Sequence, residues 1–137
     1  MELDEALGLL RRMQLVNLAT IDGDQPRVRA VTLIPHADLL WISSRDSAGK
    51  MEQIRRNDRV EFNLTVGEGD DLGTLRVTGR LEIIDDPEVK RELAEQMPFF
   101  DMIFESVDDP DYTLMRFDPS RIKVLFPYKE VMATFDL

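Results

Sequence analysis

Three apolar, strand-like runs separated only by short turns constrain the fold of this chain most strongly. The runs are Leu15–Ile21, Val28–Ile34 and Leu39–Ser43, and the turns between them are Asp22–Asp24 and Pro35–Asp38. The Asp-Gly pair in the first turn favours the positive backbone dihedral angles of a tight hairpin. Turn signals at this spacing indicate an antiparallel barrel with inserted helices rather than a doubly wound parallel sheet.

The rest of the chain continues the same pattern. Further strands are expected at Val60–Val66, Leu75–Ile84, Tyr112–Phe117, Arg121–Phe126 and Glu130–Phe135, and helices at Leu3–Met13, Lys50–Asn57, Pro87–Gln96 and Phe99–Val107. Asp46 or Ser47 is the expected N-cap of the second helix, and Asn57 its left-handed C-terminal residue. Gly79 predicts a bulge or a close approach of the backbone within its strand. Residues 1–137 are therefore predicted to form a single, mainly β domain.

Composition excludes several classes of site. The chain has no cysteine and one histidine, His36, which excludes disulfides, thiolate metal sites and a histidine-rich metal cluster. The acids at Asp85–Asp86 and Asp108–Asp111 have the spacing of helix caps and loops rather than of a calcium loop. A net charge of −10 argues against nucleic acid or an anionic membrane as the main partner. No run is long enough to span a membrane, and the N-terminus is amphipathic rather than signal-like, so we expect a cytoplasmic protein.

One segment reverses the overall charge. Gln25–Val60 holds seven basic and four acidic residues, a net charge of +3, whereas the remainder of the chain carries −13. A phosphomonoester carries nearly two negative charges and needs several charge-assisted donors. The sequence therefore predicts a site for a small anion within this basic segment.

Arg29 and Lys50 are the cations best placed for that site. Arg29 lies on a predicted strand face with apolar neighbours, where a lone guanidinium needs a partner or a ligand. Lys50 follows Ser47 at the start of a predicted helix, whose free N–H groups also favour anions. Ser44 and Ser47 add hydroxyl donors, and Gly49 leaves room for a ligand. Arg55 and Arg56, in contrast, are expected on an ordinary solvated helix face.

Three motifs in order resemble one known family. They are the segment ATIDGDQPRVRAV at Ala19–Val31, the segment LWISSRDSAGKMEQIRRNDRV at Leu40–Val60, and LRVTG at Leu75–Gly79. Together they resemble the FMN-binding split-barrel proteins of the pyridoxamine 5'-phosphate oxidase-like superfamily, over nearly the whole chain. The resemblance implies an antiparallel, Greek-key-like split β-barrel. It also implies a homodimer with FMN bound without a covalent link at the interface.

The family pattern also implies which residues contact the cofactor. Arg29 and Lys50 would hold the phosphate with help from Ser44 and Ser47. Other positions of the pattern lie along the flavin ring or reach it from the second subunit. Those along or close to the ring are Val31, Thr32, Ile42 and Ser43, and those from the second subunit are Thr74 and Arg76. Trp41 either packs near the ring or belongs to the core or interface.

The chain departs from the family pattern in two places. Ala48 and Gly49 separate Ser47 from Lys50 where many members have one residue, which affects the phosphate contact of Ser47 most. No counterpart is found of the C-terminal segment with which the true oxidases grip pyridoxal phosphate. We therefore expect a flavin-dependent oxidoreductase acting on a small molecule, and not a true pyridoxamine phosphate oxidase.

Other functions stay open at this stage. One is a non-enzymatic FMN-binding or stress-related protein, and another is a related barrel that uses haem or a deazaflavin. His36 is expected at the surface rather than as an acid–base catalyst. The Met- and Phe-rich segment 97–104 is expected to pack over a barrel end or a neighbouring subunit, with a substrate pocket as the alternative. No catalytic acid or base is predicted.

Overall fold

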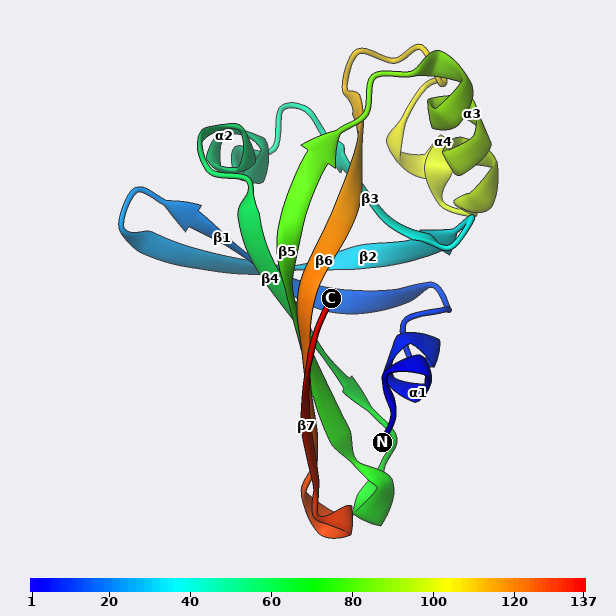
Figure 1. Ribbon diagram of the computed structural model, residues 1–137. Helices are drawn as coiled ribbons and strands as arrows, with labels where there is room; N and C mark the ends of the chain where they lie inside the picture. Colours follow the sequence, from blue (N-terminus) through cyan, green and yellow to red (C-terminus); the bar gives the residue numbers. More distant parts are fainter.

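The computed structural model describes residues 1–137 as one seven-stranded antiparallel sheet with helices at its edges (Figure 1). The strands are β1 (Gln14–Asp22), β2 (Gln25–His36), β3 (Leu39–Arg45), β4 (Arg59–Val66), β5 (Gly73–Ile83), β6 (Tyr112–Phe126) and β7 (Val131–Asp136). The helices are α1 (Leu3–Gly8), α2 (Gly49–Arg56), α3 (Pro87–Gln96) and α4 (Phe100–Ile103), with short 3-10 turns η1 (Gly69–Asp71) and η2 (Pro127–Lys129).

Six of the strands close into a barrel. The strand order is β3-β2-β1-β4-β5-β6-β7, and β6 also pairs with β3, which joins the two ends of the six-stranded part. Strands β1 to β3 form a meander, and the connection through α2 returns β4 to the far side of β1. This order, with the fourth strand beside the first, is a Greek key. The expected antiparallel split barrel is confirmed.

Strand β6 is one continuous strand, where the sequence predicted two. Its first half pairs with β3 and its second half with β7, while β5 runs along both halves. Pro119 lies at the junction opposite Gly79, and the register of β5 and β6 shifts there. The predicted bulge at Gly79 is confirmed. A Cβ atom at this glycine would lie 2.3 Å from the backbone oxygen of Asp118, so only glycine fits.

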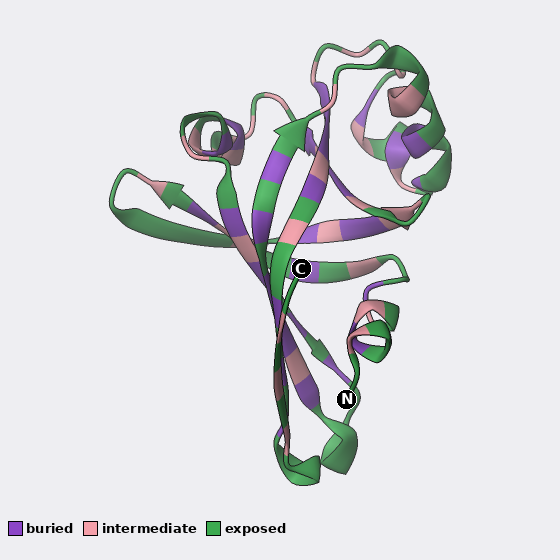
Figure 2. Cartoon of the chain, viewed as in Figure 1, coloured by how far each residue is buried: buried purple, intermediate pink, exposed green.

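The apolar residues form two cores on opposite sides of the sheet. The larger fills the barrel, where Phe62 and Phe117 meet edge to face with ring centroids 4.9 Å apart. The smaller lies beneath α3 and α4 and contains Ile34 and Trp41. The alternation predicted for β2 explains this division, because Val31 and Leu33 enter the larger core while Ile34 enters the smaller. Figure 2 shows buried and exposed residues alternating along β4, β5 and β6.

The helix termini correct several expectations. Helix α1 ends at Gly8 rather than Met13. Helix α2 begins after Ala48 with no side-chain cap. The Asp46 carboxylate, an expected cap, instead accepts from Arg55 and from the Thr113 hydroxyl. Asn57 is extended rather than left-handed, and its side chain accepts a bond from the Arg59 N–H. The last predicted helix is shorter, spanning only Phe100–Ile103.

Helix α3 occupies its predicted range and begins at the Asp86 N-cap, which accepts bonds from two backbone N–H groups. None of the helices combines the length and the apolar character needed to cross a bilayer.

Candidate functional site

Arg29 lies on β2 with its guanidinium fixed by neutral oxygens. Its Nη1 donates to the Thr20 hydroxyl at 2.7 Å and to the Leu18 carbonyl at 3.2 Å, and its Nη2 donates to Gln53 Oε1 at 3.0 Å. Desolvation by burial, followed by the nearby charge of Arg27, lowers the pKa of Arg29. The sequence predicted that this arginine needs a partner or a ligand. Its partners within the chain carry no negative charge.

Lys50 is the second cation of the site and lies in the first turn of α2. Its side chain is half-buried and makes no hydrogen bond or ion pair within the chain. Burial, and then the charge of Arg29, lowers the pKa of Lys50. Two cations are therefore held close enough to influence each other, partly removed from water and without a carboxylate. Such an arrangement favours a bound anion.

The remaining cations of the basic segment are exposed, and most of them have a carboxylate partner. Four of them form ion pairs within the chain: Arg27 with Asp22, Arg45 with Asp111, Arg55 with Asp46 and Arg56 with Glu52. Arg59 is exposed, forms no ion pair and lies at the start of β4. The expectation that Arg55 and Arg56 belong to a solvated face is confirmed, since both are exposed and paired. Of the seven cations in this segment, only Arg29 and Lys50 are half-buried and form no ion pair.

A cavity of about 300 Å³ opens beside Lys50. Of the residues predicted to contact a cofactor, five line this cavity: Val31, Thr32, Ser43, Ser44 and Lys50. They come from β2, β3 and the start of α2, which the barrel brings together. The cavity is also lined by Ala30, Arg45 and Ala48, and by Phe99, Ile103 and Phe104 of the α4 segment.

The other five predicted contacts do not line this cavity; they are Arg29, Ile42, Ser47, Thr74 and Arg76. Thr74 and Arg76 are on β5, opposite Thr65 and Asn63 of β4, and do not line the cavity. The family pattern places them in a second subunit, so their role stays a prediction. Ile42 is fully buried in the larger core, one residue before the cavity-lining Ser43.

The two serines differ in their surroundings. The buried Ser44 hydroxyl donates to the Arg45 carbonyl at 2.9 Å and lies in the cavity wall. The Ser47 N–H donates to Asp111 Oδ1 at 3.0 Å, and this bond is the main cause of the lowered pKa of Asp111. Asp111 also pairs with Arg45, so its carboxylate fixes the loop that precedes α2. A carboxylate beside Ser47 disfavours a phosphate at this position.

Sequence reasoning missed Thr20 and Gln53. Thr20 is the polar member of the inward face of β1, after Val16 and Leu18, and is only 1% exposed. Gln53 lies three residues after Lys50 and therefore on the same side of α2. Two signals in the sequence could have identified Thr20 and Gln53. One is a polar residue on the inward face of a strand, and the other is a polar residue one helical turn after the lysine.

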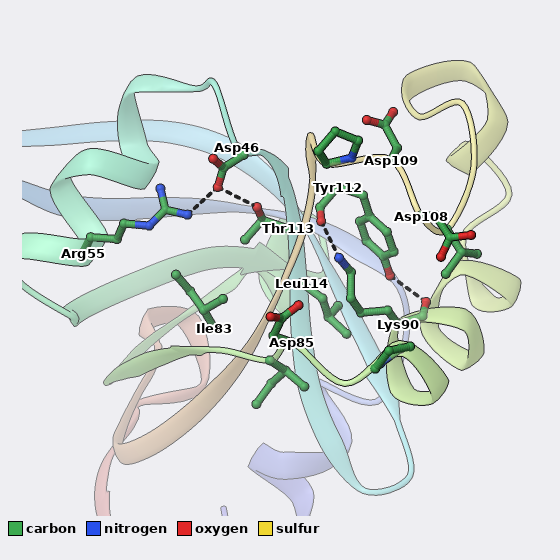
Figure 3. Close-up of a pocket in the computed structure, with 14 residues that line it drawn as sticks. Asp46, Arg55, Ile83, Asp85, Lys90, Asp108, Asp109, Tyr112, Thr113 and Leu114 are labelled. Carbon is green, nitrogen blue, oxygen red and sulfur yellow. Dashed lines mark hydrogen bonds and ion pairs between the residues drawn. The ribbon is translucent and has the colours of Figure 1, made fainter.

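A larger cavity, of about 450 Å³, lies between α2, α3 and the start of β6 (Figure 3). Its cations are already engaged: Arg55 pairs with Asp46, and Lys90 Nζ donates to the Tyr112 carbonyl at 2.8 Å. Its wall also carries exposed carboxylates, including Asp85 and Asp108. Internally paired cations and excess carboxylates make this cavity unsuitable for a phosphate.

The aromatic segment before β6 has a mixed role. Phe100 and Phe104 pack on Tyr112 in the smaller core, with centroids 5.0 and 4.9 Å from its ring, which confirms packing over a barrel end. Phe99 and Phe104 also line the 300 Å³ cavity, and the alternative of a substrate pocket stays a prediction. Trp41 belongs to the smaller core and donates to the His36 carbonyl at 3.1 Å.

Comparison with known proteins shows the family of this chain. The family model for pyridoxamine 5'-phosphate oxidase matches residues 3–126. The chain belongs to the pyridoxamine 5'-phosphate oxidase family. No protein of curated function matches it in sequence.

Solved structures support the fold of this family member. A NimC/NimA family protein from Clostridium acetobutylicum is 29% identical with a TM-score of 0.81, covering 98% of this chain and 91% of that one. General Stress Protein 26 from Bacillus anthracis is 20% identical with a TM-score of 0.79 over the full length of both chains. A heme binding protein from Mycobacterium smegmatis is 14% identical with a TM-score of 0.80, covering 96% of this chain and 56% of that one.

Proposed function

We propose that this member of the pyridoxamine 5'-phosphate oxidase family binds FMN and acts as a flavin-dependent oxidoreductase on a small molecule. One observation carries the proposal: Arg29 and Lys50 are neighbouring half-buried cations without a carboxylate partner, and Lys50 lines a cavity together with four of the expected flavin-contacting residues. The phosphate of FMN supplies the charge that this pair lacks. A cytoplasmic location, the expectation from the sequence, is part of the same proposal.

The residues favour a phosphate-bearing flavin over haem. Haem is usually held by an axial side chain, most often histidine. The one histidine, His36, is bonded through Nε2 to Glu92 at 2.6 Å and does not line the cavity. A deazaflavin carries a phosphate too, so the cofactor that co-purifies must be identified by mass. Recovery of haem or a deazaflavin in place of FMN would refute the assignment.

A second copy of the chain would complete the site. The outer face of the β1–β2 hairpin carries Leu15 and Val28, each 69% exposed, and continues through Ala30 and Thr32 into the cavity wall. Exposed apolar surface of this kind is typical of a subunit interface. We expect a homodimer by size-exclusion chromatography with light scattering. Val28→Asp should dissociate it, whereas Tyr128→Asp on η2 should not.

The chain's own contribution to chemistry is binding and orientation. A bound flavin supplies the hydride or electron transfer. The cavity wall carries hydroxyls and cations but no carboxylate or imidazole, so we assign no catalytic acid or base. Bleaching of the bound flavin by NADH or NADPH, with reoxidation in air, would support an enzyme. Inertness to both would support the alternative, a non-enzymatic flavin-binding or stress-related protein.

The phosphate assignment has its own test. An Arg29→Ala, Lys50→Ala double variant should lose FMN on gel filtration, because both charge-assisted contacts are removed together. An Arg55→Ala, Arg56→Ala variant is the matched control, since these two cations pair with Asp46 and Glu52 on the surface and should not affect FMN. Full retention of FMN by the first variant would refute the site.

A further inference from the structure

Gln53 occupies the centre of a hydrogen-bond network around Arg29. Its Oε1 accepts from the Thr20 hydroxyl at 2.6 Å and from Arg29 Nη2 at 3.0 Å. The Thr20 hydroxyl in turn accepts from Arg29 Nη1 at 2.7 Å. Both groups that face Oε1 are donors, so the network fixes the orientation of the amide. Gln53 belongs to α2 and Thr20 to β1, so the network ties the helix to the strand that flanks Arg29.

The acceptors in this network are all uncharged. They are the Gln53 amide oxygen, the Thr20 hydroxyl and the Leu18 carbonyl. A carboxylate partner would also fix the geometry of this partly buried arginine, but it would neutralise the charge. Neutral oxygens also hold the guanidinium in place, and they leave the full positive charge for a ligand.

We propose that Gln53 is a positioning residue for the anion site, and that its uncharged carbonyl oxygen is what keeps Arg29 available to a phosphate. The inference rests on the proposed function and adds a reason for selectivity. The site distinguishes the phosphorylated flavin from its neutral parent because α2 presents an amide, and not a carboxylate, to the guanidinium. Glutamate at this position would make the same hydrogen bonds while cancelling the charge.

Gln53→Glu therefore separates a positioning role from a merely structural one. The variant retains the acceptor and the side-chain length, so the fold and its thermal midpoint should be kept. FMN affinity should fall by about tenfold or more, because a carboxylate now competes with the phosphate for Arg29. Riboflavin, which has the same ring system without the phosphate, should bind with unchanged affinity. Gln96→Glu is the matched control, since Gln96 is exposed on α3 and should alter neither ligand's affinity.

The outcomes are distinguishable. If the wild-type protein binds FMN no more tightly than riboflavin, the proposed phosphate site fails before any variant is made. If the wild-type protein prefers FMN and Gln53→Glu keeps that preference, only the role of Gln53 is overturned. Gln53→Met provides a second test that adds no charge. It removes the acceptor, so FMN affinity should fall severalfold with riboflavin unchanged, and an unaltered FMN affinity would overturn the proposal.

Discussion

Lys50→Met should make the unliganded protein more stable while weakening its affinity for FMN. Lys50 has no hydrogen-bond or ion-pair partner, and both burial and the charge of Arg29 disfavour its ammonium, as its lowered pKa shows. Methionine keeps the unbranched side chain and has nearly the same helix propensity as lysine. The substitution therefore removes a charge that the fold accommodates at a cost, and it removes little else.

The two effects have opposite signs and different sizes. Relief of desolvation and of repulsion from Arg29 should raise the free energy of unfolding by about 0.5–1 kcal/mol, or the thermal midpoint by about 2–4 °C. Loss of one charge-assisted contact to the phosphate should cost about 1.5–3 kcal/mol of binding, a factor of about 10–150 in Kd. Thermal unfolding without ligand, and flavin fluorescence titration with FMN and riboflavin, measure the two quantities.

Arg56→Met is the control for this prediction. Arg56 is an exposed member of an i,i+4 ion pair with Glu52, so its loss should change stability by less than about 0.5 kcal/mol and leave FMN binding alone. A Lys50→Met protein that is clearly less stable than the wild type would show that the ammonium is held by a stabilising partner. An unchanged preference for FMN over riboflavin would remove Lys50 from the site.

Three further predictions concern the bulge, the pH dependence and the loop before α2. Gly79→Ala should lower the free energy of unfolding by about 2–4 kcal/mol in a chemical denaturation experiment, since its Cβ would lie 2.3 Å from a backbone oxygen of β6. Gly8→Ala, whose Cβ meets nothing within 4 Å, should not destabilise the fold. FMN affinity should decrease as the pH rises through the lowered pKa of Lys50, starting below the ordinary lysine value of about 10.4, while riboflavin affinity shows no such step. Asp111→Ala removes the carboxylate that holds the loop through Ser47 and Arg45 and should lower the free energy of unfolding by about 1–3 kcal/mol, a result that equal denaturation curves for the two proteins would contradict.

Much of the fold could be predicted because its signals are local. The Asp-Gly turn, the alternation of β2 and the proline at the start of α3 each depend on a few adjacent residues. Errors occurred where a distant segment supplied the partner. Strand β6 continues through Pro119 because β5 and β7 pair with its second half, which no local pattern shows. The start of α2 differs from the expectation because the carboxylate of Asp46 bonds to Arg55 and to Thr113, and Thr113 lies far along the chain.

Some residues of the candidate site could likewise be predicted from local sequence patterns, and others could not. The sequence identified Arg29 and Lys50, since an arginine among apolar neighbours and a lysine at a helix start are visible as patterns. It did not identify Thr20 and Gln53, whose importance depends on contacts between β1, β2 and α2. It placed Arg55 and Arg56 on a solvated face, but it did not show that Asp46 is the partner of Arg55 or Asp111 the partner of Arg45.

The sequence by itself determined that this protein is an antiparallel barrel with a basic segment in an acidic chain. Turn chemistry, strand alternation and net charge are properties of neighbouring residues and of composition, so they need no tertiary structure. The tertiary structure decided which charges stay unpaired. Seven basic residues lie in that segment, and only packing shows that Arg29 meets neutral oxygens and Lys50 meets no partner. The availability of a charge depends on burial and on the group that faces it, and both are set when distant segments come together.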